Sequence, residues 1–319
     1  MNKKEMIRAY SAWSAVCIFW GTTYLAIRIG VASFPPALFA GLRFGLAGLI
    51  FFAVLRMRGY SLPTRGELLD IAVVGVLLLV FANGVVVWSE QWVPSSIAAL
   101  IVATLPFWIV GIEALIPHGD RLTVRKTIGI LVGFAGLVIL LGPDFSKALD
   151  SAYLRGLLAI IWAPVAWAAG SIYSKYRTIR SNPFMAASLQ LIIAGGVLVV
   201  VGFFAGEFSR LRFAPESIAA LVYLAIFGSI VGYVSYIYAL AKLPASKVSM
   251  YAYVNPVIAV ILGWLVLDER LDWQVLTATA VVLIGVVLVK TARSRESKIL
   301  ESDTAQTPSQ KEPDFMGRA

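Results

Sequence analysis

The sequence predicts an all-α integral membrane protein with ten transmembrane helices, arranged as two inverted five-helix repeats. Its composition is the first observation: 59% of the residues are hydrophobic, only 14% are charged, and the mean hydropathy is +0.83. Soluble domains are about 45–50% apolar and about 25% charged. The second observation is that apolar runs long enough to span a bilayer recur along the whole chain, and the third is that the first half is repeated in the second.

Each apolar run is predicted to be a transmembrane helix. Crossing about 30 Å of hydrocarbon takes about 20 mostly apolar residues, and backbone groups in lipid must be paired within the segment. The first run follows the basic start MNKKEMIRAY but is too long for a signal-peptide core, so we predict that it is retained. The fifth and tenth runs are the shortest and are predicted to be scaffold. In order, the runs are residues 12–31, 37–55, 69–88, 95–116, 127–142, 156–174, 184–205, 217–240, 247–267 and 274–290.

A ten-residue phrase occurs twice. FWGTTYLAIR at 19–28 and AWAAGSIYSK at 166–175 both have Trp second and a cation last. Pro36 and Pro183 keep the same spacing of 147 residues. Because composition alone does not align such positions, the match indicates an internal duplication.

The duplication continues into the fourth and ninth runs, where VPSSIAALIVATLP (93–106) aligns with LPASKVSMYAYVNP (243–256), both prolines included. The predicted repeats cover 12–142 and 156–290. Five helices is an odd number, so the second repeat must enter the membrane in the opposite orientation, as in secondary transporters with a substrate site between inverted repeats. Residues 291–319 are rich in Ser, Thr, Pro, Glu and Lys and are predicted to be a disordered cytoplasmic tail.

The net charge of +9 is distributed as in a membrane protein, not as in a nucleic-acid-binding protein. With the N-terminus in the cytoplasm, 20 of the 27 Lys and Arg residues fall on the cytoplasmic side and 5 on the other side, while Arg28 and Arg43 lie within spans. This asymmetry predicts that both termini are cytoplasmic. No nucleic-acid partner is expected.

Cys17 and His118 are each the only residue of their type. An internal disulfide and a His/Cys metal cluster are therefore excluded by counting. No cofactor and no metal site are expected. The lone thiol in the first span is predicted to be structural.

Several motifs resemble the drug/metabolite transporter superfamily and, within it, the EamA family of ten-helix exporters. They are WGTTYLAIR, LRFGLAGL, the proline-containing fourth and ninth runs, and the paired segments GDRLT (119–123) and DERLD (268–272). The resemblance covers residues 12–290. It implies two EamA repeats, alternating access, export of small metabolites such as amino acids, and a bacterial cytoplasmic membrane. Asp120 departs from the glutamate that the family usually has there, in a predicted structural turn.

Arg43, about seven residues into the second run, is the first candidate for a substrate-binding residue. A charge within a span suggests function, and its planar guanidinium could hold a substrate carboxylate. The alternative is a structural Arg that binds helix-end carbonyls or an internal carboxylate. Gln190 is the polar counterpart in the other repeat. Glu90 is a candidate partner for Arg43 or for Arg28, for which the alternative is snorkelling to the interface.

Glu113, in the fourth run, is a candidate for carrying a coupling proton, and the alternative is an interfacial Glu beside a basic loop. Pro106 and Pro256 occupy matching mid-span positions and predict helix breaks that line a cavity; the alternative is a packing kink. Asn83 and Asn255 are mid-span amides and further candidates for substrate contact.

Five aromatic residues are predicted to line the same cavity, although packing is the alternative for each one. An amphipathic aromatic wall would accept flat or apolar substrates. The five are Trp20, Tyr24, Trp167, Tyr236 and Tyr253.

These features together predict a secondary transporter and not an enzyme. The chain has no G-x-x-x-x-G-K-[ST] phosphate-binding loop, and no span carries paired catalytic carboxylates. The expected partners are a small-molecule substrate, the lipid bilayer, and a proton or counter-substrate. The alternatives are an exporter of amphipathic drugs or other organic anions, and a membrane scaffold or sensor that does not transport.

Overall fold

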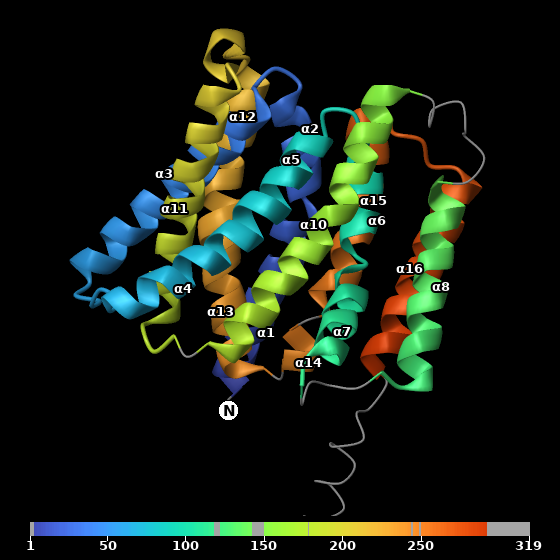
Figure 1. Cartoon of the computed structure of the whole chain (residues 1–319), viewed down its shortest axis with the longest axis horizontal. Coiled ribbons are helices and arrows are strands. Elements are labelled where there is room, and N and C mark those ends of the chain that lie inside the picture. Colours follow the sequence, from blue (N-terminus) through green and yellow to red (C-terminus); the bar gives the residue numbers. More distant parts are fainter. Residues whose placement is uncertain are drawn as a thin grey trace, which may run out of the picture.

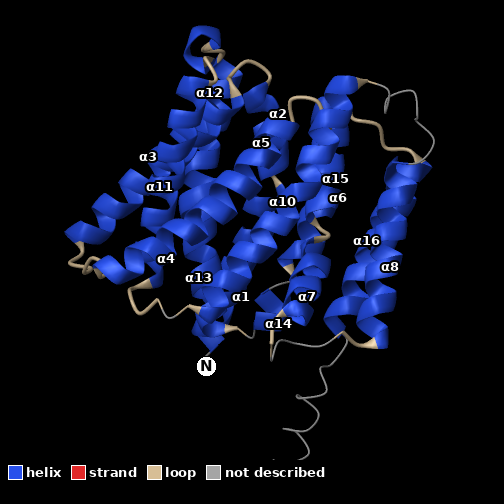
Figure 2. Cartoon of the chain, in the orientation of Figure 1, coloured by secondary structure: helices blue, strands red, loops and turns tan. Residues whose placement is uncertain are grey.

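The computed structural model describes residues 3–117, 122–141, 150–177, 179–243, 245–248 and 250–291. Within these ranges all regular structure is helical (Figure 2). His118, Asp120 and the predicted tail after residue 291 lie outside the described residues.

The first half contains five helical rods, several of them interrupted (Figure 1). The third rod has a π-helical middle segment, η1, in which the wider turn adds one residue per turn. The rods are α1 (Lys3–Gly21) with α2 (Thr23–Val31); α3 (Pro36–Met57); α4 (Arg65–Gly75), η1 (Val76–Gly84) and α5 (Val85–Ser89); α6 (Ser95–Val102) with α7 (Leu105–Leu115); and α8 (Val124–Leu141).

The second half repeats this plan, including a π-helical segment in its third rod and an interruption in its fourth. A short 3₁₀ turn, η2 (Glu207–Arg210), precedes the third rod. The rods are α10 (Ser151–Tyr176); α11 (Pro183–Phe204); α12 (Pro215–Tyr223), η3 (Leu224–Val231) and α13 (Gly232–Lys242); α14 (Ala245–Val248) with α15 (Tyr251–Leu267); and α16 (Trp273–Thr291).

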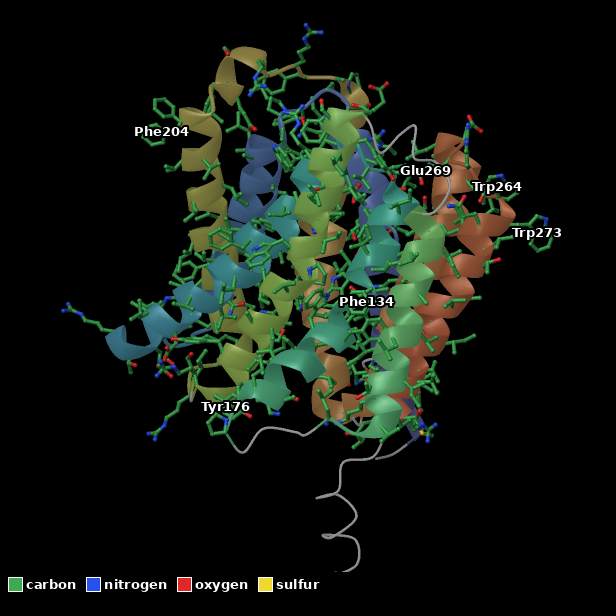
Figure 3. The ribbon with its side chains drawn as sticks, turned by 45° about the vertical axis from the view of Figure 1, so that its right-hand side comes forward. Phe134, Tyr176, Phe204, Trp264, Glu269 and Trp273 are labelled. Atoms are coloured by element: carbon green, nitrogen blue, oxygen red, sulfur yellow. The ribbon has the colours of Figure 1, made fainter. Side chains whose placement is uncertain are left out.

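The helices have the lengths and apolar surfaces of membrane spans. Eight helical stretches of the described chain are long and apolar enough to cross a bilayer, and α15 is a shorter apolar helix. The fifth rod, α8, lies along the tenth rod, α16, at one edge of the bundle (Figure 1). Phe204, Trp264 and Trp273 are exposed near the end drawn at the top, and Tyr176 is exposed near the other end (Figure 3). The prediction of an all-α membrane protein built from ten helices in two inverted repeats is confirmed.

Glycines bring matching helices of the two halves into close contact. A Cβ on Gly195 of α11 would lie 2.7 Å from the Cα of Gly45 in α3, and a Cβ on Gly285 of α16 would lie 2.7 Å from the Cα of Gly133 in α8. Small residues at such crossings allow backbones to approach closely in lipid. The second and fifth helices of each half therefore pack on their own counterparts.

Two glutamates bind backbone N–H groups of the opposite half. The Glu207 carboxylate of η2 accepts from the backbone N–H of Leu38 at 2.8 Å, at the start of α3, where N–H groups have no partner within the helix. The Glu67 carboxylate of α4 accepts from the N–H of Ser181 at 2.9 Å, just before α11. These contacts hold the ends of the two halves together.

Candidate functional site

A cavity of ≈ 120 Å³ lies between the two halves. Its wall is formed by α1, α2, α3, η1, α5, α6 and α7 of the first half and by α10, η3, α13 and α15 of the second, whereas α8, α11 and α16 contribute no lining residue. Most of the wall is apolar. The polar and aromatic lining residues are Trp20, Thr23, Tyr24, Arg43, Phe44, Asn83, Trp167, Ser229, Tyr233, Tyr251 and Asn255.

Arg43 is the cation of this wall and is only 4% exposed. Its Nε donates to the Ser229 hydroxyl at 3.2 Å, and its guanidinium carbon lies 4.8 Å from the centre of the Phe44 ring. Its Nη1 has no hydrogen-bond partner among the described residues. A buried cation with an unused donor is unfavourable unless an anion is supplied, so this nitrogen is suited to receiving an anionic group.

An aromatic cluster forms one side of the cavity. The Trp20 indole N–H donates to the Gly228 carbonyl at 3.2 Å. Its ring centre lies 5.0 Å from that of Tyr251 and 5.9 Å from that of Tyr233, both with edge-on geometry. Edge-to-face aromatic pairs are favourable beyond the area they bury, so these three rings form a stable wall that joins α1, α13 and α15.

The third helix of each half reaches the cavity at its π-helical segment. Asn83 belongs to η1, and Ser229 belongs to η3. π-Helical turns are rare and occur frequently at functional sites. Their appearance at matching places in the two repeats indicates that the wider turn is a feature of the duplicated unit.

Seven predicted site residues line the cavity. They come from α1, α2, α3, η1, α10 and α15, far apart in the sequence, and are Trp20, Tyr24, Arg43, Asn83, Trp167, Asn255 and Pro256. Asn255 has a defined environment. Turned so that its nitrogen faces acceptors, its amide donates to the carbonyls of Cys17 and Tyr251, both at 3.0 Å.

Two of the predicted tyrosines lie outside the lining. The Tyr253 hydroxyl donates to the Val286 carbonyl of α16 at 3.3 Å, and the Lys290 ammonium lies 4.8 Å from its ring centre. Tyr253 is two residues, about 200°, around the helix from Tyr251, so it points away. Tyr236 packs behind the wall, with its ring 5.3 Å from that of Trp20.

Gln190 and Glu113 also lie away from the cavity. Gln190 is at the contact between α11 and α4, where its Cα would lie 3.0 Å from a Cβ on Gly75. Glu113 is buried and forms an ion pair with Lys175 of α10. Its described partner is thus Lys175, and most of the basic loop beyond α7 lies outside the described residues.

The two prolines differ in what they do to their helices. Pro106 is the second residue of α7, directly after the interruption that ends α6. Pro256 lies inside α15, and the helix continues through it. The interruption of that rod comes earlier, after α14 ends at Val248 and before α15 begins at Tyr251. Lacking an N–H, each proline leaves the carbonyl four residues earlier without its helical donor. Those carbonyls belong to Val102 and Ala252, which both line the cavity.

Sequence reasoning missed Thr23, Ser229, Tyr233 and Tyr251 as lining residues. Helical spacing could have found Tyr251, which stands four residues before Asn255 and so shares its face. Tyr233 stands four residues after Ser229 in the same way. Ser229 itself gave no signal, because its role is apparent only from the position of Arg43.

The Arg28 side chain reaches Glu90 at the end of α5, but it binds the backbone of Glu90 and not its carboxylate. The Arg28 guanidinium donates to the backbone carbonyl of Glu90. The Glu90 carboxylate is fully buried, and neither of its oxygens has a hydrogen-bond partner among the described residues.

Comparison with known proteins gives consistent results. The sequence profile of the EamA-like transporter family matches residues 8–142 and 154–291. The uncharacterized inner membrane transporter YedA of Escherichia coli K12 is 37% identical over 290 residues, covering 91% of this chain and 92% of YedA. The uncharacterized transporter YvbV of Bacillus subtilis is 26% identical over 275 residues, covering 86% and 88%. One solved crystal structure matches this chain with a TM-score of 0.63 at 22% identity. The match covers 91% of this chain and 98% of the other chain, which shows a shared fold.

Proposed function

Because this chain belongs to the EamA-like transporter family and is a multi-pass membrane transporter, we propose that it exports small carboxylate-bearing metabolites, amino acids among them, by alternating access. The substrate occupies the cavity between the two halves. Its carboxylate binds Arg43, and the aromatic wall contacts the rest of the molecule.

The observation that carries this proposal is the buried guanidinium of Arg43, whose Nη1 is without a partner among the described residues. Hydrogen bonds to charged groups contribute about 1.5–3 kcal/mol. A substrate carboxylate would supply the missing acceptor and bring a negative charge next to the guanidinium, which favours anionic over neutral substrates.

The size and the remaining polar groups of the cavity favour a small substrate. A cavity of about 150 Å³ accepts benzene, so ≈ 120 Å³ suits a molecule of comparable size. Once the Asn255 nitrogen bonds Cys17 and Tyr251, its carbonyl oxygen can accept from another direction. Together with the aromatic faces, which attract cations, this oxygen supports binding of an amino-acid ammonium.

The proposed location is the bacterial cytoplasmic membrane, with both termini in the cytoplasm. The distribution of Lys and Arg supports this orientation, and the relative YedA is described as an inner membrane transporter. A second candidate substrate class is amphipathic drugs or other organic anions, which the largely apolar wall would also accommodate.

Counterflow in proteoliposomes tests the function. We expect exchange of at least one labelled amino acid or small organic acid by the wild type. Arg43→Gln should reduce the apparent affinity for this substrate roughly ten- to a hundredfold, as expected when a hydrogen bond to a charged group is lost. Arg155→Gln is the matched control, because Arg155 is exposed and bonds the Ser151 carbonyl at 3.0 Å. Wild-type affinity in a folded Arg43→Gln protein would contradict the proposed site.

A further inference from the structure

We propose that Glu90 carries the coupling proton of this transporter, and that one proton moves with each substrate carboxylate that binds Arg43. This inference rests on the proposed function and adds its coupling ion and the residue responsible. The sequence had suggested Glu113 for that role.

The position of Glu90 is unusual for a carboxylate. It follows α5 directly, where its N–H donates to the Val86 carbonyl at 3.0 Å, one turn from the cavity wall formed by Val86. Its side chain has no exposed surface, and both of its oxygens are without hydrogen-bond partners among the described residues. A carboxylate in such a place is costly in the ionised form, and protonation removes that cost.

Three other buried or partly buried glutamates of the described chain are already engaged. Glu269 accepts four hydrogen bonds from the N–H and hydroxyl groups of Ser95 and Ser96, at 2.5–3.0 Å, which is how an ionised carboxylate bonds. Glu207 accepts N–H groups at the start of α3, and Glu113 is paired with Lys175. Glu90 is therefore the carboxylate best placed to exchange a proton.

Charged groups face Glu90 from several elements. Arg28 of α2, Arg43 of α3 and Glu269 after α15 interact with it electrostatically, and so does the Tyr24 hydroxyl. On α10, Tyr153 and Arg155 are the nearby titratable residues, and the Arg155 guanidinium carbon lies 5.9 Å from the Trp92 ring centre. The neighbouring segments η1 and α6 carry no charged residue. Burial and the Glu269 charge raise the pKa of Glu90 well above its usual range, while Arg28 and Arg43 act in the opposite direction.

Charge balance then links the proton to the substrate. With Glu90 ionised, the two arginines are balanced by Glu90 and Glu269. A substrate carboxylate on Arg43 adds a third negative charge, and protonation of Glu90 restores neutrality in a site where unbalanced charge is costly. Because such coupling is reciprocal, a proton on Glu90 also leaves Arg43 available to the substrate.

The proton is conserved through the cycle. It passes from water to a Glu90 carboxylate oxygen on the side from which the substrate binds. It returns to water on the other side when the substrate leaves. Transport is therefore proton–carboxylate symport with a 1:1 stoichiometry, and substrate efflux carries protons outward.

The test is Glu90→Gln, which is close in shape and mimics the protonated state. In proteoliposomes with a labelled carboxylate that the wild type exchanges, the wild type should accumulate substrate under an imposed pH gradient. Glu90→Gln should keep counterflow but lose this accumulation. Glu216→Gln, at an exposed glutamate of α12, is the matched control and should retain both. At a pH at which Glu90 is ionised before the substrate binds, a pH-sensitive dye with purified protein should report uptake of about one proton per substrate bound by the wild type, which needs no variant to fold.

Four results would overturn parts of this account, and they are distinguishable. Accumulation driven by the pH gradient in Glu90→Gln would exclude Glu90 as the proton carrier, as would loss of coupling in Glu113→Gln alone. Counterflow by the wild type without response to a pH gradient and without proton uptake would overturn proton coupling but leave the proposed function intact. Absence of wild-type counterflow with every carboxylate would overturn the proposed function, and the coupling proposal with it.

Discussion

Two buried side chains carry the proposed chemistry, an arginine on the cavity wall and a glutamate one turn from it. Arg43 supplies a guanidinium nitrogen that lacks a partner among the described residues, and Glu90 supplies a carboxylate in the same condition. Arg43 lies in α3 and Glu90 directly follows α5, and no salt bridge joins them among the described residues. This separation leaves each side chain able to respond to a third charged group.

The tyrosines of α15 provide a matched pair for testing the wall. Tyr251→Leu should weaken substrate affinity about twofold to tenfold, because an aromatic contact contributes about 0.5–1.5 kcal/mol beyond area burial. Tyr253→Leu should leave the affinity unchanged, since its ring contacts α16 and not the cavity. Concentration-dependent counterflow measures both, and equal effects would contradict the assignment of Tyr251 to the wall.

Burial of Glu90 also predicts a pH-dependent stability. Its pKa is raised in the folded protein, so the folded state binds the proton more tightly than the unfolded state does. The associated stability is fully present below the ordinary glutamate pKa of about 4.3 and is lost as the pH rises through the raised value of Glu90. Thermal unfolding in detergent should therefore show the Tm of the wild type falling relative to that of Glu90→Gln as the pH rises through this window. A constant difference across it, as expected for Glu216→Gln, would contradict the assignment.

Sequence could predict many of the site residues, but not the rotation of the helices that present them. Arg43, Trp20 and Asn83 were identifiable because polar and large aromatic residues are rare in mid-span positions. Sequence favoured Tyr253, whereas Tyr251 lines the cavity, because the start of α15 at Tyr251 sets the phase of that helix. In η1 and η3 the extra residue per turn shifts the exposed face, so a 3.6-residue period cannot be carried through them.

At the level of elements, interruptions and glycine contacts shape the bundle. Interruptions at α6–α7 and α14–α15, together with η1 and η3, place irregular backbone beside the cavity in both halves. Two of the uninterrupted helices, α8 and α16, pack on each other through Gly129, Gly133 and Gly285. The prediction that the fifth and tenth helices are scaffold is consistent with their absence from the cavity wall.

The contact between α3 and α11 can be tested with two adjacent glycines. A Cβ on Gly195 would lie 2.9 Å from the Gly41 carbonyl oxygen and would force the two helices apart, whereas a Cβ on Gly196 would meet nothing within 4 Å. Gly195→Ala should destabilise the protein by about 1–3 kcal/mol, as overpacking does. Gly196→Ala should be neutral or slightly stabilising, since Ala favours a helix over Gly by about 0.5–1 kcal/mol. Equal Tm values for the two variants would contradict the close crossing.

The whole molecule is best understood as two inverted halves around a shared cavity. Composition and the repeated motifs were sufficient to predict this architecture, because apolar runs in lipid have few folding options and odd-numbered repeats must be inverted. Contacts between loops and helices were not predictable. Glu269 binds Ser95 and Ser96 at one end of the bundle, and Glu113 pairs with Lys175 at the other. The partners in each contact are far apart in the sequence, and no helical or repeat spacing relates them.

These contacts at both ends join the first half to the second. In an alternating-access cycle, one set must separate while the other persists, so that the cavity faces each side in turn.

The central claim, that a substrate cavity between the halves opens alternately to each side, can be measured with one cysteine. Cys17 is the only native cysteine, so Ala252→Cys in a Cys17→Ser background places a single thiol on the cavity wall. A membrane-impermeant methanethiosulfonate, added to right-side-out or inside-out vesicles, should label it from both sides, and a carboxylate identified by counterflow should slow both reactions. The Cys17→Ser protein should remain unlabelled. Labelling from one side only, or labelling that the substrate does not slow, would contradict this account.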